Sequence, residues 1–118
     1  MKRSNEDLHV WQEGMALAKE VYAATVSFPK EEMYGLTSQM RRAAVSVPIN
    51  IAEGAARGSK KEFLQFLIIA RGSLMELETQ ILLSHDFGFI GNHDSLMKRT
   101  NKTYALLNGL MEKLRDRR

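Results

Sequence analysis

One apolar stretch is the main guide to the architecture: Phe63-Leu64-Gln65-Phe66-Leu67-Ile68-Ile69-Ala70, which holds one polar residue in eight. Apolar residues continue from it at three- and four-residue steps, the period of an α-helix, at Phe63, Phe66, Leu67, Ala70, Leu74, Leu77 and Ile81. A second stripe beside the first consists of Leu64, Ile68, Met75 and Leu82. A helix that is apolar over most of its circumference is buried on most sides, so we expect this segment at the centre of a helical assembly.

Four helices in all are predicted, over about residues 10–27, 38–57, 60–87 and 95–115. Phe28-Pro29 ends the first helix, because a residue before proline is pushed out of the α region, and Thr37 is a suitable N-cap for the second. Ser59 and Glu62 form a capping box before the third helix, and Asp94 caps the fourth. No segment shows the Val, Ile and Thr alternation of strands. Because short connections make neighbouring helices antiparallel, the sequence predicts an all-α, antiparallel up-and-down four-helix bundle in one domain over residues 1–118.

The inward faces of the other helices follow from the same periodicity. We expect them to consist of Trp11, Met15, Ala18, Val21, Tyr22 and Thr25 in the first helix, Met40, Ala44, Val47, Ile51 and Ala55 in the second, and Leu96, Arg99, Thr103, Leu106, Leu110 and Leu114 in the fourth. Pro48 lies within the second helix, where its ring clashes with the carbonyl of Ala44, so a kink is expected there. A polar side chain can satisfy the carbonyl that proline leaves unpaired, which favours an architectural role for Asn50 and Glu53.

The composition is that of an ordinary globular protein, with 44% hydrophobic and 26% charged residues and a formal net charge of +3. The sequence contains no cysteine, which excludes disulfides and thiolate metal sites. No stretch approaches the ~20 consecutive apolar residues that a membrane span needs. The polar residues 1–7 lack the apolar core of a signal peptide, so a cytoplasmic location is expected.

The second stripe of the third helix indicates self-association. If the first stripe faces its own bundle, four side chains still need cover, namely Leu64, Ile68, Ile69 and Met75. Exposing all four would leave an apolar patch of a size that monomers rarely carry. These residues are therefore candidates for an oligomer interface, and the alternative is a central helix that its own bundle buries on most sides.

Several motifs resemble a known family. They are Val10-Trp11-Gln12, Phe28-Pro29-Lys30, Tyr34-Gly35-Leu36-Thr37, Arg41-Arg42-Ala43-Ala44-Val45-Ser46-Val47-Pro48-Ile49-Asn50-Ile51-Ala52-Glu53-Gly54, Ser59-Lys60-Lys61-Glu62-Phe63 and Gly72-Ser73-Leu74-Met75-Glu76-Leu77-Glu78-Thr79-Gln80. In order and spacing they resemble the four-helix-bundle family called 23S rRNA-intervening-sequence proteins, over roughly residues 8–90. One departure from the family pattern is Ile49, where a small or polar residue usually precedes the Asn.

This resemblance implies an up-and-down bundle that assembles as a ring-like homopentamer and has no known enzyme activity. Related bundles serve as nucleic-acid-binding accessory subunits of reverse transcriptases in diversity-generating retroelements. The partners that the resemblance implies are therefore further copies of the chain, RNA or DNA, and a protein such as a reverse transcriptase.

Basic residues concentrate between positions 41 and 71, a segment that contains six of them and only two acidic residues, Glu53 and Glu62. Repeated around a ring, they would favour a phosphate backbone, and the candidate nucleic-acid-binding residues are Arg41, Arg42, Arg57, Lys60, Lys61 and Arg71. The alternative is ion pairing within the bundle. A helix hairpin centred on Gly58 places Arg41 opposite Glu76 and Arg42 opposite Glu78, while Glu53 and Arg57 stand at i,i+4.

No set of residues in the sequence predicts an enzyme or a cofactor. Nucleotide-binding glycine patterns, serine nucleophile elbows and H-E-x-x-H are absent, and Glu53 has no obvious His or Asp partner in the sequence for acid–base work. His85-Asp86 and His93-Asp94 flank the third connection, but their spacing matches no metal-ligand pattern, so we expect a solvated loop and no metal.

Two functions remain after these exclusions. The first is a non-enzymatic, homo-oligomeric bundle that binds nucleic acid as an accessory protein. The alternative is a scaffold or assembly module that binds a protein partner through the ring.

Overall fold

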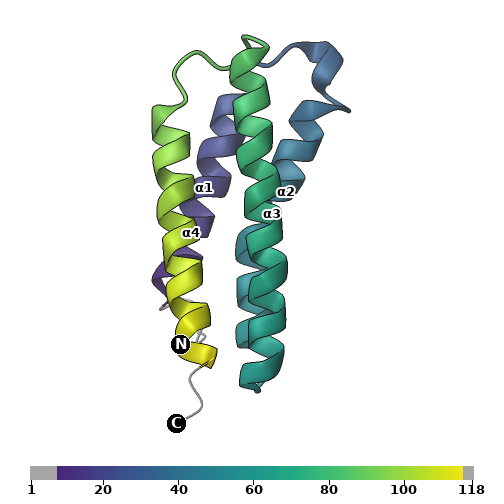
Figure 1. Cartoon of the computed structure of the whole chain (residues 1–118). Coiled ribbons are helices and arrows are strands. Elements are labelled where there is room, and N and C mark those ends of the chain that lie inside the picture. Colours follow the sequence, from purple (N-terminus) through teal and green to yellow (C-terminus); the bar gives the residue numbers. More distant parts are fainter. Residues whose placement is uncertain (1–7, 116–118) are drawn as a thin grey trace.

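Four α-helices lie side by side as an antiparallel bundle in the computed structural model, which describes residues 8–115 (Figure 1). The elements are α1 (His9–Thr25), a short 3₁₀ turn η2 (Lys30–Glu32), α2 (Leu36–Ala55), α3 (Lys60–Asp86) and α4 (Asp94–Arg115). Both α1 and α3 pack against α2 and α4, so the four helices form a ring around one core. The described residues contain no strand, and the predicted all-α four-helix fold is confirmed.

The core is built around α3, as the apolar stretch predicts. Its 27 residues make a helix about 40 Å long, and its first stripe is fully buried at Leu67, Leu74, Leu77 and Ile81. The neighbouring helices meet these residues with fully buried side chains that include Leu17, Val21, Met40, Val47, Ile51, Leu107 and Met111. No helix among residues 8–115 is long and apolar enough to cross a bilayer.

The starts of α2 and α3 are held in different ways. Ser59 is the N-cap of α3 as predicted, since its Oγ accepts a hydrogen bond from the Glu62 backbone N–H at 3.1 Å. The prediction of Thr37 as the N-cap of α2 is wrong, because Thr37 lies inside the helix and is buried. Instead, Glu32 Oε1 accepts a hydrogen bond from the N–H of Leu36 at 3.1 Å, so the 3₁₀ turn supplies the capping group.

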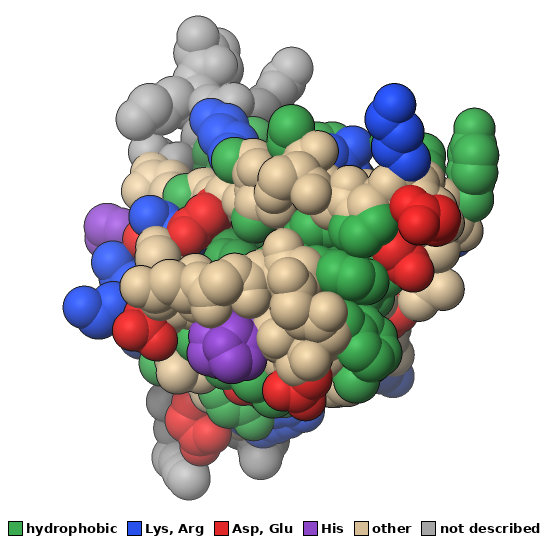
Figure 2. Space-filling view, turned by 90° about the horizontal axis from the view of Figure 1, so that it is seen from above, with side chains coloured by type: hydrophobic (Ala, Val, Ile, Leu, Met, Phe, Trp, Pro, Cys, Tyr) green, Lys and Arg blue, Asp and Glu red, His purple; other side chains and the backbone are tan. Residues whose placement is uncertain are grey.

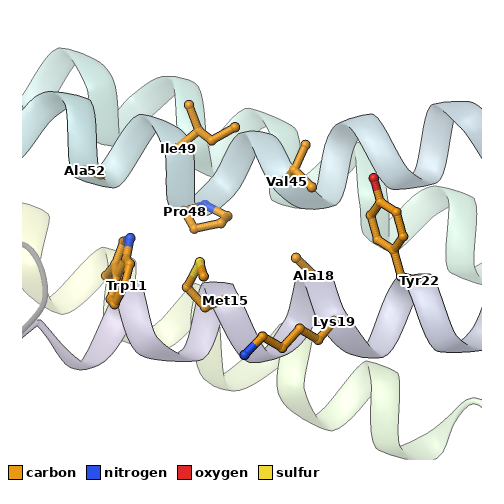
Figure 3. Close-up of a pocket in the computed structure, with 9 residues that line it drawn as sticks. All are labelled: Trp11, Met15, Ala18, Lys19, Tyr22, Val45, Pro48, Ile49 and Ala52. Atoms are coloured by element: carbon orange, nitrogen blue, oxygen red, sulfur yellow. The ribbon is translucent and has the colours of Figure 1, made fainter.

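The inward face of α1 agrees with the predicted one at Ala18, Val21 and Thr25 and differs from it at the other three positions. Its buried residues are Val10, Gly14, Leu17, Ala18, Val21 and Thr25. Three predicted core residues lie beside this buried face, rotated about the helix axis toward the groove side. They are Trp11, Met15 and Tyr22, and they face the space between α1 and α2 (Figure 3). Arg99 of α4 likewise faces α1 at the edge of the core, while Thr100, Leu107 and Met111 point inward.

The hairpin of α2 and α3 turns at Gly58, which has φ of 88° and so occupies a backbone region that favours glycine. Just before it, Gly54 lies where the two helices approach closely. A Cβ at Gly54 would lie 2.7 Å from Phe66 Cβ and 3.0 Å from Phe63 Cδ1. Pro48 lies within α2 without interrupting the helix, and the kink expected at this position stays a prediction.

Candidate functional site

An apolar groove runs along the bundle between α1 and α2 (Figure 3). It encloses about 540 Å³ and is lined by Trp11, Met15, Ala18, Lys19 and Tyr22 from α1 and by Val45, Pro48, Ile49 and Ala52 from α2. Of these nine residues only Lys19 carries a charge. The groove can therefore bind an apolar side chain or ligand, and it offers few polar groups that a reaction would need.

Gly14 and Pro48 lie where the two helices that form this groove meet. Gly14 is buried against α2, and a Cβ there would make ordinary van der Waals contacts with Val47 Cγ1 at 3.4 Å and with Pro48 atoms at 3.5 Å. Pro48 points from α2 toward α1 and lies opposite Met15 in the view of Figure 3. Although Pro48 is buried, Ile49 next to it is 56% exposed, so α2 closes the floor of the groove and leaves its rim open.

Arg41 lies near Tyr22, at one end of the groove. Its Nε donates to Thr25 Oγ1 at 2.8 Å, and its guanidinium carbon lies 4.6 Å from the centre of the Tyr22 ring. Thr25 Oγ1 in turn donates to the carbonyl of Val21 at 2.9 Å. The contacts of Arg41 are therefore with α1, and the expected ion pair with Glu76 is not formed.

Arg42 does not form its expected ion pair with Glu78 within residues 8–115 either. It lines a separate polar groove between α2 and α3, together with Glu76. The register of the hairpin also differs from the one assumed from the sequence. Ser46 lies opposite Ser73, their hydroxyl oxygens 2.8 Å apart, whereas symmetry about Gly58 would place Ser46 opposite Ala70.

The other four candidate basic residues fall into two groups. Arg57 pairs with Glu53 at 3.0 Å and stacks over Phe66, with 4.9 Å from its guanidinium carbon to the ring centre. Lys60 and Lys61 begin α3 beside it, both exposed and without an ion pair in the described part of the chain. Arg71 is half-buried and donates from Nη1 to Asn108 Oδ1 of α4 at 3.0 Å.

The six candidate nucleic-acid-binding residues therefore do not form one surface. Arg57, Lys60 and Lys61 gather at the turn between α2 and α3, which we call the basic turn. Arg41, Arg42 and Arg71 lie along the length of the bundle and face different neighbours. The opposite end of the bundle shows acidic and basic side chains interspersed with exposed hydrophobic ones (Figure 2).

The four candidate interface residues of α3 also differ in how exposed they are. Ile68 and Ile69 are 45% and 51% exposed, while Leu64 and Met75 are half-buried against the core. Thus their own bundle covers part of the second stripe. Leu82, which continues that stripe, is 44% exposed.

The candidate architectural residues lie near Pro48. Asn50 Nδ2 donates to the Ser46 carbonyl at 2.8 Å and to Ser46 Oγ at 2.9 Å. Because Ser46 Oγ also contacts Ser73 Oγ, Asn50 belongs to a polar link between α2 and α3. The carbonyl that Asn50 satisfies is that of Ser46, one helical turn before it, and not the Ala44 carbonyl considered from the sequence.

His85 and His93 come together at the connection between α3 and α4. Their rings stack with centroids 4.0 Å apart and an angle of 30° between the planes. Nowhere in residues 8–115 do three or more His, Cys, Asp or Glu side chains gather as a metal site would require. This stacked pair therefore lacks the further ligands that a tetrahedral metal would need.

A charged cluster between α1 and α4 was not anticipated from the sequence. Arg99 donates from Nε to Glu20 at 2.9 Å and from Nη1 to Glu13 at 3.1 Å, and Lys102 Nζ lies 3.1 Å from the same Glu13 carboxylate. The hydrogen bond to Glu20 raises the pKa of Arg99 above its usual value. Because the partners are separated by 79 and 86 positions, only the placement of Arg99 within an apolar stripe could have signalled this cluster.

These features define an all-α bundle protein with an apolar groove along one face and a basic turn at one end. The 23S rRNA-intervening sequence protein model matches residues 6–109, and the chain belongs to that family. The crystal structure of a protein with unknown function from the S23 ribosomal protein family of Bacteroides thetaiotaomicron is similar, with a TM-score of 0.78 and 20% identity. The similarity covers 87% of this chain and 98% of that one, and at this identity it shows the shared fold. No curated protein matches the chain significantly.

Proposed function

We propose that the chain is a non-catalytic, homo-oligomeric protein of the cytoplasm that binds nucleic acid as an accessory subunit. The observation that carries the proposal is the pair of open apolar surfaces, the groove between α1 and α2 and the exposed isoleucines of α3. Soluble monomers rarely expose large contiguous apolar patches, and association with further copies covers such surfaces. A ring of five is the arrangement that the family resemblance favours.

Sedimentation and light scattering over a dilution series test self-association. We expect a mass several times the 13.4 kDa of one chain, stable to dilution into the micromolar range. A mass of one chain throughout that range would overturn the proposal.

The basic turn supports nucleic-acid binding. Lys60 and Lys61 are exposed, and no acidic side chain of the described residues neutralises either one. In a ring, each subunit would present one such turn, so the positive charges would repeat around a closed surface. Contacts of this kind are made to phosphates, do not depend on base sequence and weaken with salt.

A mobility-shift assay with structured RNA and with duplex DNA tests this part of the proposal. Reversing both charges, Lys60→Glu with Lys61→Glu, should weaken binding and flatten the salt dependence by about 0.9 in slope for each duplex phosphate that the protein no longer neutralises. The matched control is Lys30→Glu with Lys98→Glu, which changes the net charge equally at the opposite end of the bundle. Equal weakening in both double variants, or no binding by the parent at low salt, would reject the basic turn as the nucleic-acid-binding surface.

A scaffold that binds a protein partner is the second candidate function. It is favoured by apolar side chains at the end opposite the basic turn (Figure 2), where Tyr34 is 97%, Phe87 60% and Met33 48% exposed. Affinity capture from the native cytosol, with and without nuclease, separates the two functions. A partner that stays bound after nuclease treatment supports the scaffold, and one that is released supports a nucleic-acid bridge.

A further inference from the structure

We infer that the subunits join head to tail, with an apolar ridge on α3 of one copy seated in the groove between α1 and α2 of the next. The ridge consists of Leu64, Ile68, Met75 and Leu82. This inference rests on the proposed self-association and assigns the two surfaces that carry it.

The groove has the chemistry of a protein interface. Eight of its nine lining residues are apolar or aromatic, and its rim is open, with Ile49 56% and Tyr22 42% exposed. Trp11 and Met15 face α2 within it (Figure 3). Aromatic residues and methionine are enriched at protein interfaces, and a polar or strongly charged ligand would find only Lys19 to pair with among the lining residues.

The ridge lies on the side of α3 that borders α4, where Ile68 is 45% and Leu82 44% exposed and the other two residues are half-buried. Arg71 shares this side with Ile68 and Met75, at steps of three and four residues, and Arg71 bonds to Asn108 of α4. The ridge spans eighteen residue steps, or about 27 Å of helix, and the α1 wall of the groove from Trp11 to Tyr22 spans about 16 Å. The ridge is therefore long enough to fill the groove from end to end.

One charge beside the ridge is complementary to those of the groove, while Arg71 on the ridge side bonds to Asn108 of its own α4. Lys19 lines the groove, and Arg41 lies at its Tyr22 end. On α3, Glu78 follows Met75 at a three-residue step and forms no ion pair with any of the residues 8–115. Docking the ridge in the groove would bring Glu78 toward Lys19 and Arg41, and a pairing of opposite charges sets the register of such contacts.

The two surfaces lie on different faces of each molecule. The groove is formed by α1 and α2, whereas the ridge borders α4, and α1 does not pack against α3. A contact between unlike surfaces is heterologous, and it generates a ring when the rotation between subunits closes. Two copies meeting groove to groove would instead form a closed dimer and leave both ridges exposed.

Two single variants test the arrangement. Ile49→Glu disables the groove and Ile68→Glu disables the ridge, while Val26→Glu, at a site 77% exposed and outside both surfaces, is the control. We expect each of the first two variants to be a folded monomer by circular dichroism and light scattering, and the control to assemble like the parent. Mixed together, the two monomers should form a dimer of one chain each, because one intact groove and one intact ridge remain.

Disulfide trapping provides a second readout, and the cysteine substitutions that it needs leave both surfaces nearly unchanged. Since the chain has no cysteine, Ile49→Cys and Ile68→Cys introduce the only thiols. Oxidising a mixture of the two variants should link unlike chains, and the double variant should yield a ladder of linked chains.

The outcomes separate this inference from the proposed self-association. A parent protein that is monomeric overturns both. An assembling parent whose Ile49→Glu and Ile68→Glu variants still assemble, or whose mixed cysteine variants do not link, overturns the inference and leaves self-association standing. Loss of assembly in Ile49→Glu alone, with efficient linkage between Ile49→Cys chains, would identify a groove-to-groove dimer.

Discussion

Replacing Gly54 with alanine tests the close approach of α2 and α3 at this position. The added Cβ would lie 2.7 Å from Phe66 Cβ and 3.3 Å from the Phe63 carbonyl oxygen. Real Cβ contacts essentially never fall below 3.0 Å, and Phe66 Cβ is fixed to the backbone of α3. A rotamer change cannot relieve this contact, so the two helices must separate.

The expected cost is that of overpacking a well-filled site, about 1–3 kcal/mol of the free energy of unfolding. Alanine also improves helix propensity over glycine, by up to about 1 kcal/mol in a helix interior. Gly72→Ala isolates this second effect, because a Cβ at Gly72 on the exposed face of α3 meets nothing within 4 Å. We therefore expect Gly72→Ala to stabilise the protein and Gly54→Ala to fall below it by about 1–3 kcal/mol.

Urea denaturation followed by circular dichroism measures both variants at one protein concentration, which keeps any contribution from self-association comparable. A Gly54→Ala protein as stable as Gly72→Ala would show that α2 and α3 do not approach as described. Gly54→Leu extends the series, and a greater destabilisation than for alanine is expected because the added volume is greater.

Three further substitutions probe the contacts that hold the helices. Arg99→Ala removes the contacts to Glu20 and Glu13 and should lower the free energy of unfolding by about 1 kcal/mol, an effect that shrinks in high salt because Arg99 is 36% exposed; an effect that salt leaves unchanged would contradict an electrostatic origin. Ser59→Ala removes the cap of α3 and should cost about 1 kcal/mol, whereas Ser27→Ala, outside the helices, should cost nothing measurable in the same melts. Gln80→Met should raise the midpoint of thermal unfolding, because the buried Gln80 Oε1 has no hydrogen-bond partner, and a lower midpoint would argue against this.

The central part of the fold could be predicted because its signals are local. The cap at Ser59 and the uninterrupted stripe from Phe63 to Ile81 lie within one helix, and both are found in the structure. The start of α2 could not be predicted in the same way. Glu32 caps it from the preceding turn, whereas sequence rules look for a capping side chain at the N-cap position itself.

The inward face of α1 could not be decided from periodicity. Val10, Leu17 and Val21 form one apolar stripe, and Trp11 and Met15 belong to another that is displaced by one residue. Both stripes follow a helical period, and the larger side chains favour the second. The structure buries the first stripe together with Gly14, which adds no hydrophobicity to a pattern, and leaves Trp11 and Met15 at the groove.

The apolar groove and the charged cluster depend on contacts between helices that are far apart in the sequence. Arg41 meets Tyr22 and Thr25, and Arg99 meets Glu20, only after the helices have been rotated and aligned. Rules based on local sequence predict neither the rotation of a helix about its axis nor its alignment with its neighbours. The basic turn is different, since Lys60 and Lys61 adjoin Arg57 through a short turn and their proximity is already set by the chain.

An even number of helices returns the polypeptide to the end from which it set out. The first residues of α1 and the last residues of α4 accordingly lie at the same end as the basic turn, while the two longer connections lie at the other (Figure 1). An affinity tag or fluorescent fusion at either terminus would crowd the lysines offered to nucleic acid. A label inserted between the exposed residues Gly91 and Asn92 would keep that end clear without disturbing the buried Ile90, and it is the better position for anyone who measures nucleic-acid binding.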